Sequence, residues 1–294
     1  TVTHYPRYSI DFKQMNSKVI AFKELLLFLI FFLLLFLLRN ARLLANIQLL
    51  DWAIYGFFFL FLGAVFYLGR AKKHWKLPSW LNVLTFLNGM LGNFVFLFGA
   101  LYLGSLHGTE ALTRYLYLPY LGGMILSMIL GKRILQGIFP NTVPVLLGGL
   151  ALSLFVLLFP QSFVLGLFLL SFWQSLTSSW LNQRYAQEPS LPVDQRMIAK
   201  FTTQNKGSVT HQFVMMAFLL IMTTLFDRPM NILLQLSGND PLSSPDLHVL
   251  NDAKWLNCGI LMVAVIVVYI LWKKNHSTGE SDETIKTNDD FPLE

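Results

Sequence analysis

The sequence predicts an all-α fold, a polytopic membrane helix bundle with about eight transmembrane helices. Three observations predict it. The chain is 54% hydrophobic and only 13% charged, whereas a soluble domain has about 25% charged residues. Apolar stretches of about 20 residues, long enough to cross a bilayer core, recur along the sequence. Basic residues are concentrated in alternate connections between these stretches, as in membrane proteins with a defined orientation.

The spans follow one another along most of the chain. The first is continuously apolar only from Leu25 to Leu38, because Lys23 and Glu24 lie at its edge, where long charged side chains reach the membrane surface. Each of the other windows carries at most one charged residue. The eight predicted spans are 19–38, 49–68, 80–104, 112–130, 142–159, 162–181, 211–227 and 255–272.

The basic residues indicate the orientation of the chain. With eight spans, 17 of the 22 Lys and Arg residues fall on the side that holds both termini, and 5 fall on the other side. Cytoplasmic loops carry the positive excess, so both ends are predicted to be cytoplasmic. The net charge of +6 is therefore a topology signal, and we expect no nucleic-acid partner.

Composition divides the chain into four segments. A polar start and an acidic tail flank the apolar region, and the tail has the low hydrophobicity of a disordered segment. The segments are a polar N-terminal cytoplasmic segment (1–18), two transmembrane helices with a basic loop (19–79), a six-helix bundle (80–272) and a disordered acidic cytoplasmic tail (273–294).

Residues that carry nucleophilic, metal or phosphate chemistry form no recognisable motif. The sequence has no HExxH, no GxSxG, no glycine-rich phosphate loop and a single cysteine, Cys258. The six histidines are scattered, and we expect most of them at membrane interfaces or in loops. No carboxylate falls near the middle of a predicted span, where proton relays place their acidic groups. We therefore expect no catalytic residue, metal site, cofactor or enzyme activity, and no obvious proton-coupling group.

Uncharged polar residues are concentrated in the third and sixth spans, whereas the first and fifth are nearly all apolar. Amides cost free energy in hydrocarbon unless they are paired, so the polar faces should point into the bundle or into a watery cavity. The alternative is that they only join helices. The third span contains Asn82, Thr85, Asn88 and Asn93, and the sixth contains Ser171, Gln174, Ser175 and Ser178 on one helical face.

Small residues also recur at every fourth position in the fourth span, at Gly123, Ser127 and Gly131. This spacing favours close packing against another helix.

The fourth span is followed by the stretch "GKRILQGIFPN", predicted to be a short cytoplasmic loop. It resembles the loop motif of the major facilitator superfamily, in which a glycine, basic residues and a second glycine form a tight turn within each six-helix half. The matching residues are Gly131, Lys132, Arg133 and Gly137, whereas the acidic member of the motif is absent. Any short basic loop with glycine is the alternative.

The wider pattern strengthens the resemblance over residues 19–272. That superfamily is built from three-helix repeats, in which the first helices line the cavity and the third helices face lipid. Here spans three and six, which are polar, take the place of first helices, and span five, which is nearly all apolar, takes the place of a third helix. Two preceding spans and a basic loop resemble the fourteen-span drug:proton antiporters. The resemblance implies that the chain is the C-terminal half of such a transporter with the two middle helices, and that an N-terminal half is missing.

The resemblance implies proton-coupled multidrug efflux of a small amphipathic or lipophilic compound, in a bacterial inner membrane and in contact with lipid. The alternative is a non-transporting membrane scaffold or accessory subunit. The expected cytoplasmic gate is the four-residue motif above. The expected substrate cavity comprises Asn88, Asn93, Phe94, Phe98, Tyr120, Ser171, Trp173, Gln174, Ser175 and Ser178.

Overall fold

The computed structural model describes residues 77–137, 142–191, 193–225 and 244–288, with single positions at 29, 30, 32, 33, 36, 52, 56, 59, 60 and 63. The chain forms two compact units, Thr1–Ala71 and Lys72–Glu294, and each is considered by itself. The single positions in the first unit are helical. Most of the predicted spans 19–38 and 49–68, and the N-terminal segment 1–18, lie outside the described residues.

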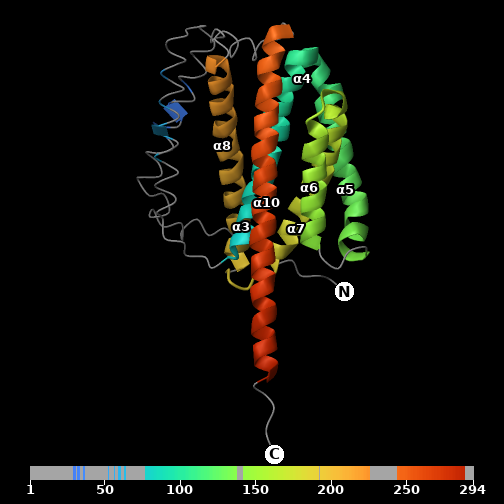
Figure 1. Ribbon diagram of the computed structural model, residues 1–294, viewed down its shortest axis with the longest axis vertical. Helices are drawn as coiled ribbons and strands as arrows, with labels where there is room; N and C mark the ends of the chain where they lie inside the picture. The colour runs from blue at the N-terminus through green and yellow to red at the C-terminus, as the bar shows by residue number, and fades with distance from the viewer. Residues whose placement is uncertain are drawn as a thin grey trace, which may run out of the picture. The chain divides into compact units, whose positions relative to one another are not determined.

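In the described part of the second unit, every regular element is helical (Figure 1). This confirms the predicted all-α class. The rod that begins at Ser79 contains a five-residue π-helix directly after Asn93. The elements are α3 (Ser79–Asn93), η1 (Phe94–Phe98), α4 (Gly99–His107), η2 (Thr109–Ala111), η3 (Thr113–Tyr117), α5 (Leu118–Gly137), α6 (Thr142–Leu157), η4 (Pro160–Ser162), α7 (Phe163–Ala186), α8 (Val193–Leu225) and α10 (Ser244–Asn288).

Three helical stretches are long and apolar enough to cross a membrane: Ser79–His107, Pro160–Ala186 and His248–Asn275. The apolar helix α6 is shorter. These lengths fit an integral membrane protein, as predicted, because about 20 residues of helix span the roughly 30 Å hydrocarbon core.

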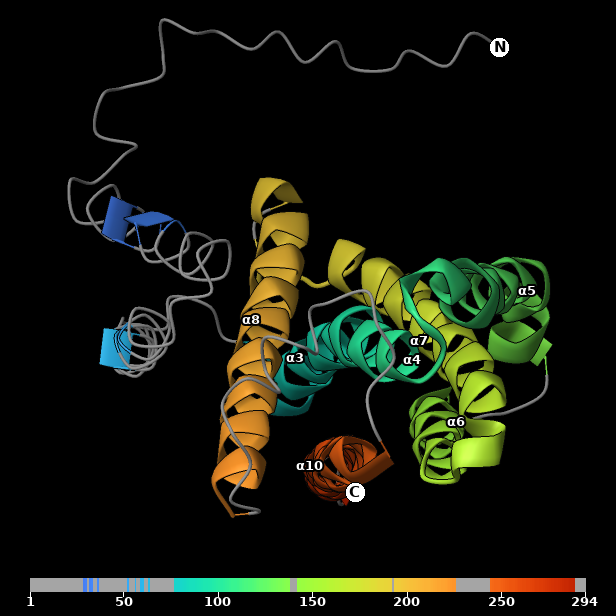
Figure 2. The same ribbon diagram turned by 90° about the horizontal axis from the view of Figure 1, so that it is seen from above.

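Helix α3 lies in the middle of the second unit (Figure 2). It packs against α8 on one side and against α10 on another, while α7 packs against both α5 and α6. Helices α3 and α8 run in the same direction, because Gly89 lies beside Gln204 and Asn93 lies beside His211.

Two glycines permit the close approach of α3 and α8. A Cβ atom at Gly89 would collide with the backbone carbonyl of Gln204, and one at Gly207 would collide with that of Phe86. Each glycine thus faces the backbone of the other helix. Contacts of this kind drive helix association where lipid removes the hydrophobic contribution.

The small-residue face of α5 packs against α7, as its spacing predicted. A Cβ atom at Gly123 would lie 3.0 Å from the backbone nitrogen of Phe172, and one at Gly131 would lie 2.9 Å from Leu176 Cδ1. Ser127, between them, is buried. Gly131 is therefore part of a helix–helix contact.

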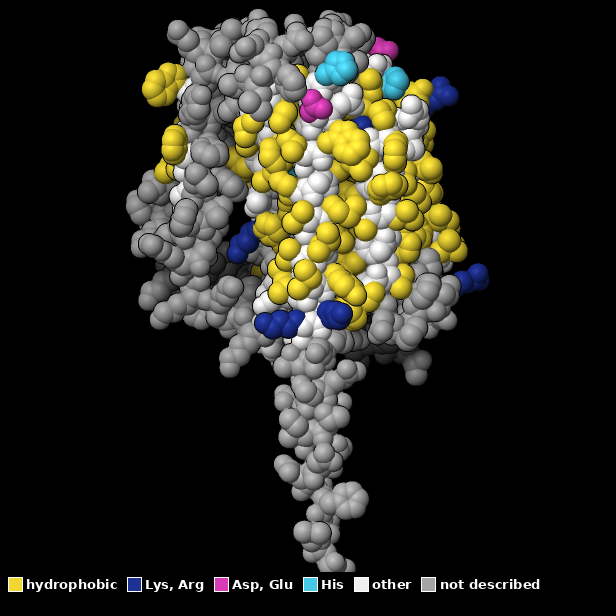
Figure 3. Space-filling view, viewed as in Figure 1, with side chains coloured by type: hydrophobic (Ala, Val, Ile, Leu, Met, Phe, Trp, Pro, Cys, Tyr) yellow, Lys and Arg dark blue, Asp and Glu magenta, His cyan; other side chains and the backbone are white. Residues whose placement is uncertain are grey.

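An apolar belt covers the outward face of α10 (Figure 3). Exposed Asp252 and Lys273 border it, and their separation of 21 residues corresponds to about 31 Å of helix, close to the thickness of a hydrocarbon core. Lys and Arg side chains gather at the lower edge of this face, and His and acidic side chains at its upper edge. The exposed residues between the borders include Trp255, Leu256, Ile260, Val263, Ile266, Val267 and Ile270.

The connection before the seventh span differs from the prediction. Helix α7 ends at Ala186 and α8 begins at Val193, so most of the expected long cytoplasmic segment is helical. Hydropathy placed the start of this span at 211 because residues 193–210 are polar. Polarity does not prevent helix formation, because Lys, Gln and Arg are good helix formers and no proline interrupts the segment after Val193.

Two further segments are helical where a loop or disorder was expected. Helix α5 continues to Gly137 and includes the predicted gate loop, and α10 continues to Asn288, well into the predicted disordered tail. An existing helix adds residues without a new nucleation step, and an isolated glycine costs only about 1 kcal/mol. The last six residues, 289–294, lie outside the described part.

Candidate functional site: a buried polar layer

A polar pair lies at the middle of the bundle. Asn93 is the midpoint of the Ser79–His107 stretch, and its Nδ2 lies 3.0 Å from Nδ1 of His211 on α8. The His211 ring is fully buried and meets the edge of Phe94, with 5.9 Å between ring centroids. His211 Nε2 has no hydrogen-bond partner among the described residues. An imidazole therefore lies near the centre of the expected membrane region.

The contact with Asn93 defines the form of this imidazole. An amide nitrogen donates hydrogen bonds, so Nδ1 accepts and the hydrogen of a neutral ring is on Nε2. A buried donor without an acceptor costs about 1–3 kcal/mol. His211 thus offers an unused N–H group inside the bundle.

A second polar contact joins α3 to α7. Gln174 Nε2 donates a hydrogen bond of 3.4 Å to the backbone carbonyl of Asn88. Gly92 makes room for this amide, since a Cβ atom there would lie 2.9 Å from Gln174 Nε2. The Asn88 side chain is fully buried, and neither its nitrogen nor its oxygen has a partner in the described part of the chain. We call Asn88, Asn93, Gln174 and His211 the polar layer.

The other predicted polar residues occupy different positions. Ser171 is buried and donates a 2.6 Å hydrogen bond to the Tyr120 carbonyl on α5. Ser178 accepts one of 3.4 Å from Lys200 on α8, and Ser175 is half-buried. The half-buried ring of Tyr120 lies 4.6 Å from that of Phe96. Ser171 and Ser178 therefore join α7 to its neighbours.

Three aromatic residues of the expected substrate cavity, Phe94, Phe98 and Trp173, are packed inside the bundle. Phe94 and Phe98 are fully buried and stack with 5.3 Å between ring centroids. Trp173 packs over Gly149 of α6. It therefore lies on the side of α7 that faces α6, whereas Gln174 lies on the side that faces α3. The i, i+4 spacing of Phe94 and Phe98 indicates packing inside the bundle, because each ring needs a neighbour of matching shape there.

The predicted gate residues all belong to α5. Gly131 is buried against α7, whereas Arg133 is exposed. Lys132 and Gly137 are helical, and their surroundings lie outside the description. The predicted tight turn is thus replaced by continuous helix as far as Gly137.

Sequence reasoning missed three buried basic residues: Lys200, His211 and Lys254. The first two were assigned to the cytoplasmic side or its edge because the seventh span was started too late. Lys254 Nζ lies 5.1 Å from the Tyr102 ring centroid and 5.9 Å from that of Phe163. Among the described residues, no three His, Cys, Asp or Glu side chains gather into a metal site.

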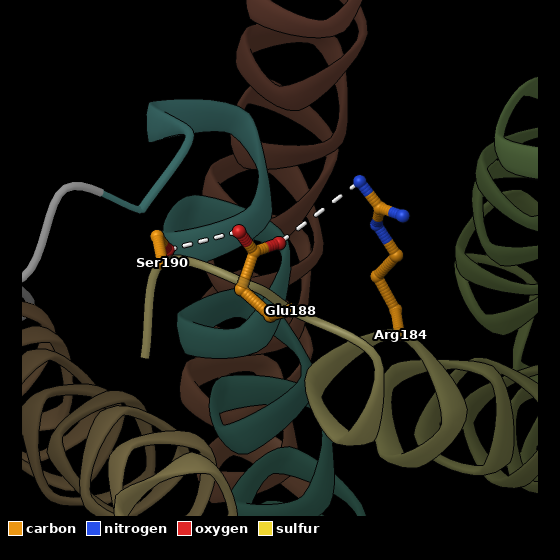
Figure 4. A network of polar contacts seen from close by, with 3 residues as sticks. All are labelled: Arg184, Glu188 and Ser190. Carbon is orange, nitrogen blue, oxygen red and sulfur yellow. Dashed lines mark hydrogen bonds and ion pairs between the residues drawn. The ribbon is translucent and has the colours of Figure 1, made fainter. Parts of the chain in front are cut away.

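The turn between α7 and α8 is held by a separate polar network (Figure 4). Ser190 donates a 2.9 Å hydrogen bond to Glu188, and Arg184 lies 3.9 Å from the same carboxylate. Arg196 donates hydrogen bonds of 2.6 Å to the Ala186 carbonyl and 3.1 Å to the Leu191 carbonyl. Arg196 thus caps the end of α7 and fixes the first turn of α8 beside it.

Replacement of Arg196 by alanine is expected to loosen this turn, because two charge-assisted hydrogen bonds to backbone carbonyls are lost. We expect a loss of about 1–3 kcal/mol of stability and faster cleavage by proteinase K between Gln187 and Leu191. Arg184→Ala is the matched control, because it removes a 3.9 Å ion pair with buried Glu188 and leaves both backbone hydrogen bonds of Arg196 in place. Equal cleavage of both variants would exclude the proposed role of Arg196.

The described residues form an all-helical bundle with three helical stretches long and apolar enough to cross a membrane, and with uncharged and titratable polar groups buried at the middle of the bundle. Comparison with protein-family models, with curated proteins and with solved structures finds no match to this chain.

Proposed function

We propose that this chain is part of a proton-coupled membrane transporter that moves a small amphipathic or lipophilic compound by alternating access. The observation that supports the proposal is the polar layer, in which Asn88 and His211 keep unused hydrogen-bonding groups. A transporter places its substrate site near the bilayer midplane, between helices. The resemblance to the drug antiporters of the major facilitator superfamily leads to the same function, with efflux across a bacterial inner membrane.

The unpaired amide favours transport over a scaffold role. Polar side chains that only join helices should be paired, as the hydroxyl of Ser171 is with Tyr120 and that of Thr85 is with Tyr185. The Asn88 side chain instead has no hydrogen-bond partner among the described residues, and burying its amide without hydrogen bonds costs free energy. A substrate or water that enters the layer would satisfy them.

The outward face of α8 supports a partner bundle. Asn205, Lys206 and Gln212 are exposed on this helix. Lys206 is five residues from His211, about 7.5 Å along the axis, and therefore well inside a core with a half-thickness of about 15 Å. A lysine exposed to lipid at that depth is costly. We infer that further helices, the proposed N-terminal half, cover this face or enclose water against it.

The proposal includes the eight-span topology with both ends cytoplasmic. In this proposal the apolar belt of α10 faces lipid, because the third helix of each three-helix repeat faces outward in the major facilitator superfamily, which the chain resembles. The connection between the seventh and eighth spans then lies outside the cell, at the end of the belt that is bordered by Asp252.

Double replacement Asn88→Leu with Gln174→Leu tests the transport role. The protein should fold to a near-normal amount, because only one hydrogen bond of 3.4 Å is lost. Export of ethidium from cells should change at least threefold relative to export of a larger dye such as rhodamine 6G. The measurement is the ratio of the two efflux rates, normalised to folded protein in the membrane.

Ser153→Ala is the control for this experiment. Ser153 is buried in α6 but bonds only to the Gly149 carbonyl of its own helix, at 2.7 Å. We expect it to change neither the ratio nor the amount of protein. If the double variant reduces folded protein and leaves the ratio unchanged, the polar layer is interhelical contact and the scaffold reading is preferred.

A further inference from the structure

We propose that His211 is the group that binds and releases the transported proton. This inference rests on the proposed function and assigns its coupling residue. His211 is level with Asn93, at the midpoint of the Ser79–His107 stretch. Each end of that stretch is 14 residues away, about 21 Å along the helix. A titratable ring at this depth is the kind of group that proton relays require.

In the described part of the chain, the elements packed around His211 provide no opposite charge. From Ser79 to Phe98, the α3 and η1 segments contain no ionisable side chain, and α7 contains none before Arg184. Within the His248–Asn275 stretch of α10, the ionisable groups are His248, Asp252, Lys254 and Cys258 toward one end and Tyr269, Lys273 and Lys274 toward the other. On α8 itself, the nearest is Lys206. Among the described residues, no carboxylate is placed to balance a charged ring.

A neutral ring therefore fits the closed layer, and a charged ring does not. Burial of an unpaired charge is strongly unfavourable, so the imidazolium should form only when water reaches the layer. Proton binding at His211 then depends on whether the bundle is open. That dependence is the condition for coupling a proton to a conformational change.

The Asn93 amide can serve both protonation states. In the present structure its nitrogen donates to Nδ1, which suits the neutral ring. Protonation adds a hydrogen at Nδ1, and a half-turn of the amide then presents its oxygen as the acceptor. Loss of the other hydrogen from Nε2 completes transfer from one side of the ring to the other. Asn93 acts as a positioning residue, and Nε2 is the free exit for the proton.

The first test uses nuclear magnetic resonance of the protein in lipid nanodiscs, with ¹⁵N-labelled histidine rings. His211→Gln identifies the His211 signals by their loss. We expect these signals to show the neutral Nε2–H form at pH 8.5, and an imidazolium signal to grow as the pH falls to 4.5, from molecules whose polar layer is open to water. Asn93→Leu should change the balance of the two neutral tautomers. Signals of His211 that stay neutral and unchanged across this range would overturn the proposal.

The second test separates coupling from transport. In inverted membrane vesicles that contain the complete transporter, with its N-terminal half, ethidium uptake driven by a pH gradient is compared with ethidium exchange, which needs no net proton movement. His211→Gln should lower gradient-driven uptake at least tenfold and keep exchange within twofold. His248→Gln, at the exposed start of the α10 span, should leave both unchanged.

The outcomes distinguish the two proposals. If wild-type protein shows neither uptake nor exchange, ethidium transport fails as the proposed function, and the resonance titration still decides whether His211 binds a proton. If His211→Gln retains gradient-driven uptake, coupling at His211 is wrong while transport stands. If His211→Gln loses exchange and driven uptake together, the ring has a structural role and the proposal is overturned.

Discussion

Replacement of Gly89 by leucine is expected to abolish folding of the bundle. The missing side chain lets α3 contact the backbone of α8 at Gln204, and Gly207 repeats the arrangement against Phe86. A leucine at position 89 would meet a carbonyl oxygen and not a movable side chain, so the helices must separate along their shared length. We expect a loss at or above the upper end of the ~1–3 kcal/mol typical of overpacking. Size-exclusion chromatography of a fluorescent fusion should show aggregate in place of a single peak.

Gly148→Leu is the matched control for this prediction. Gly148 is an exposed helical glycine on α6, and no atom lies within 4 Å of a Cβ placed there. Leucine is a better helix former than glycine and suits an outward apolar face. This variant should therefore elute as the wild type does. Similar elution of Gly89→Leu and Gly148→Leu would show that α3 and α8 do not make the described contact.

Replacement of Lys254 by methionine is expected to raise stability. Lys254 is fully buried on α10, and among the described residues its ammonium group has aromatic neighbours but no hydrogen-bond partner. Contact with the Tyr102 ring returns about 2 kcal/mol, whereas burying an ion costs several kcal/mol. Methionine fills similar volume without the charge. We expect a gain of about 1–4 kcal/mol, measured as a higher unfolding temperature in detergent.

Lys273→Met serves as the comparison for Lys254. Lys273 is exposed at the border of the apolar belt, so its charge is solvated and its loss should leave the unfolding temperature nearly unchanged. If Lys254→Met lowers the unfolding temperature instead, Lys254 has a counter-charge that stabilises the fold.

The sequence predicted the helical class because apolar length and composition are properties of single segments. It also predicted, from the spacing of Gly123, Ser127 and Gly131, that this face packs closely against another helix, and the structure identifies that helix as α7. The predicted start of the seventh span, which is now α8, was wrong for a related reason. Hydropathy measures the preference of a segment for lipid, and the first half of α8 is polar on both buried and exposed sides.

The polar layer was predicted only in part. Asn88, Asn93 and Gln174 stand out because amides are rare in apolar spans, and the structure places all three near the α3 contacts with α7 and α8. His211 was missed because its depth depends on which residue of α3 it faces, and pairing between helices 118 residues apart leaves no trace in either segment alone. Phe94 and Phe98 were expected to line the substrate cavity but are fully buried, because exposure, too, depends on neighbouring helices.

The π-helix Phe94–Phe98 begins at the residue after Asn93. A π turn holds one residue more than an α turn, and a helix can carry this surplus residue along its length without losing its continuity. When the surplus passes a given side chain, that side chain swings by roughly 100°, the angle of one residue in a helix with 3.6 residues per turn. The helical rod that holds Asn93 therefore contains a built-in rotation point, and movement of the π turn past Asn93 would aim its amide at a different helix.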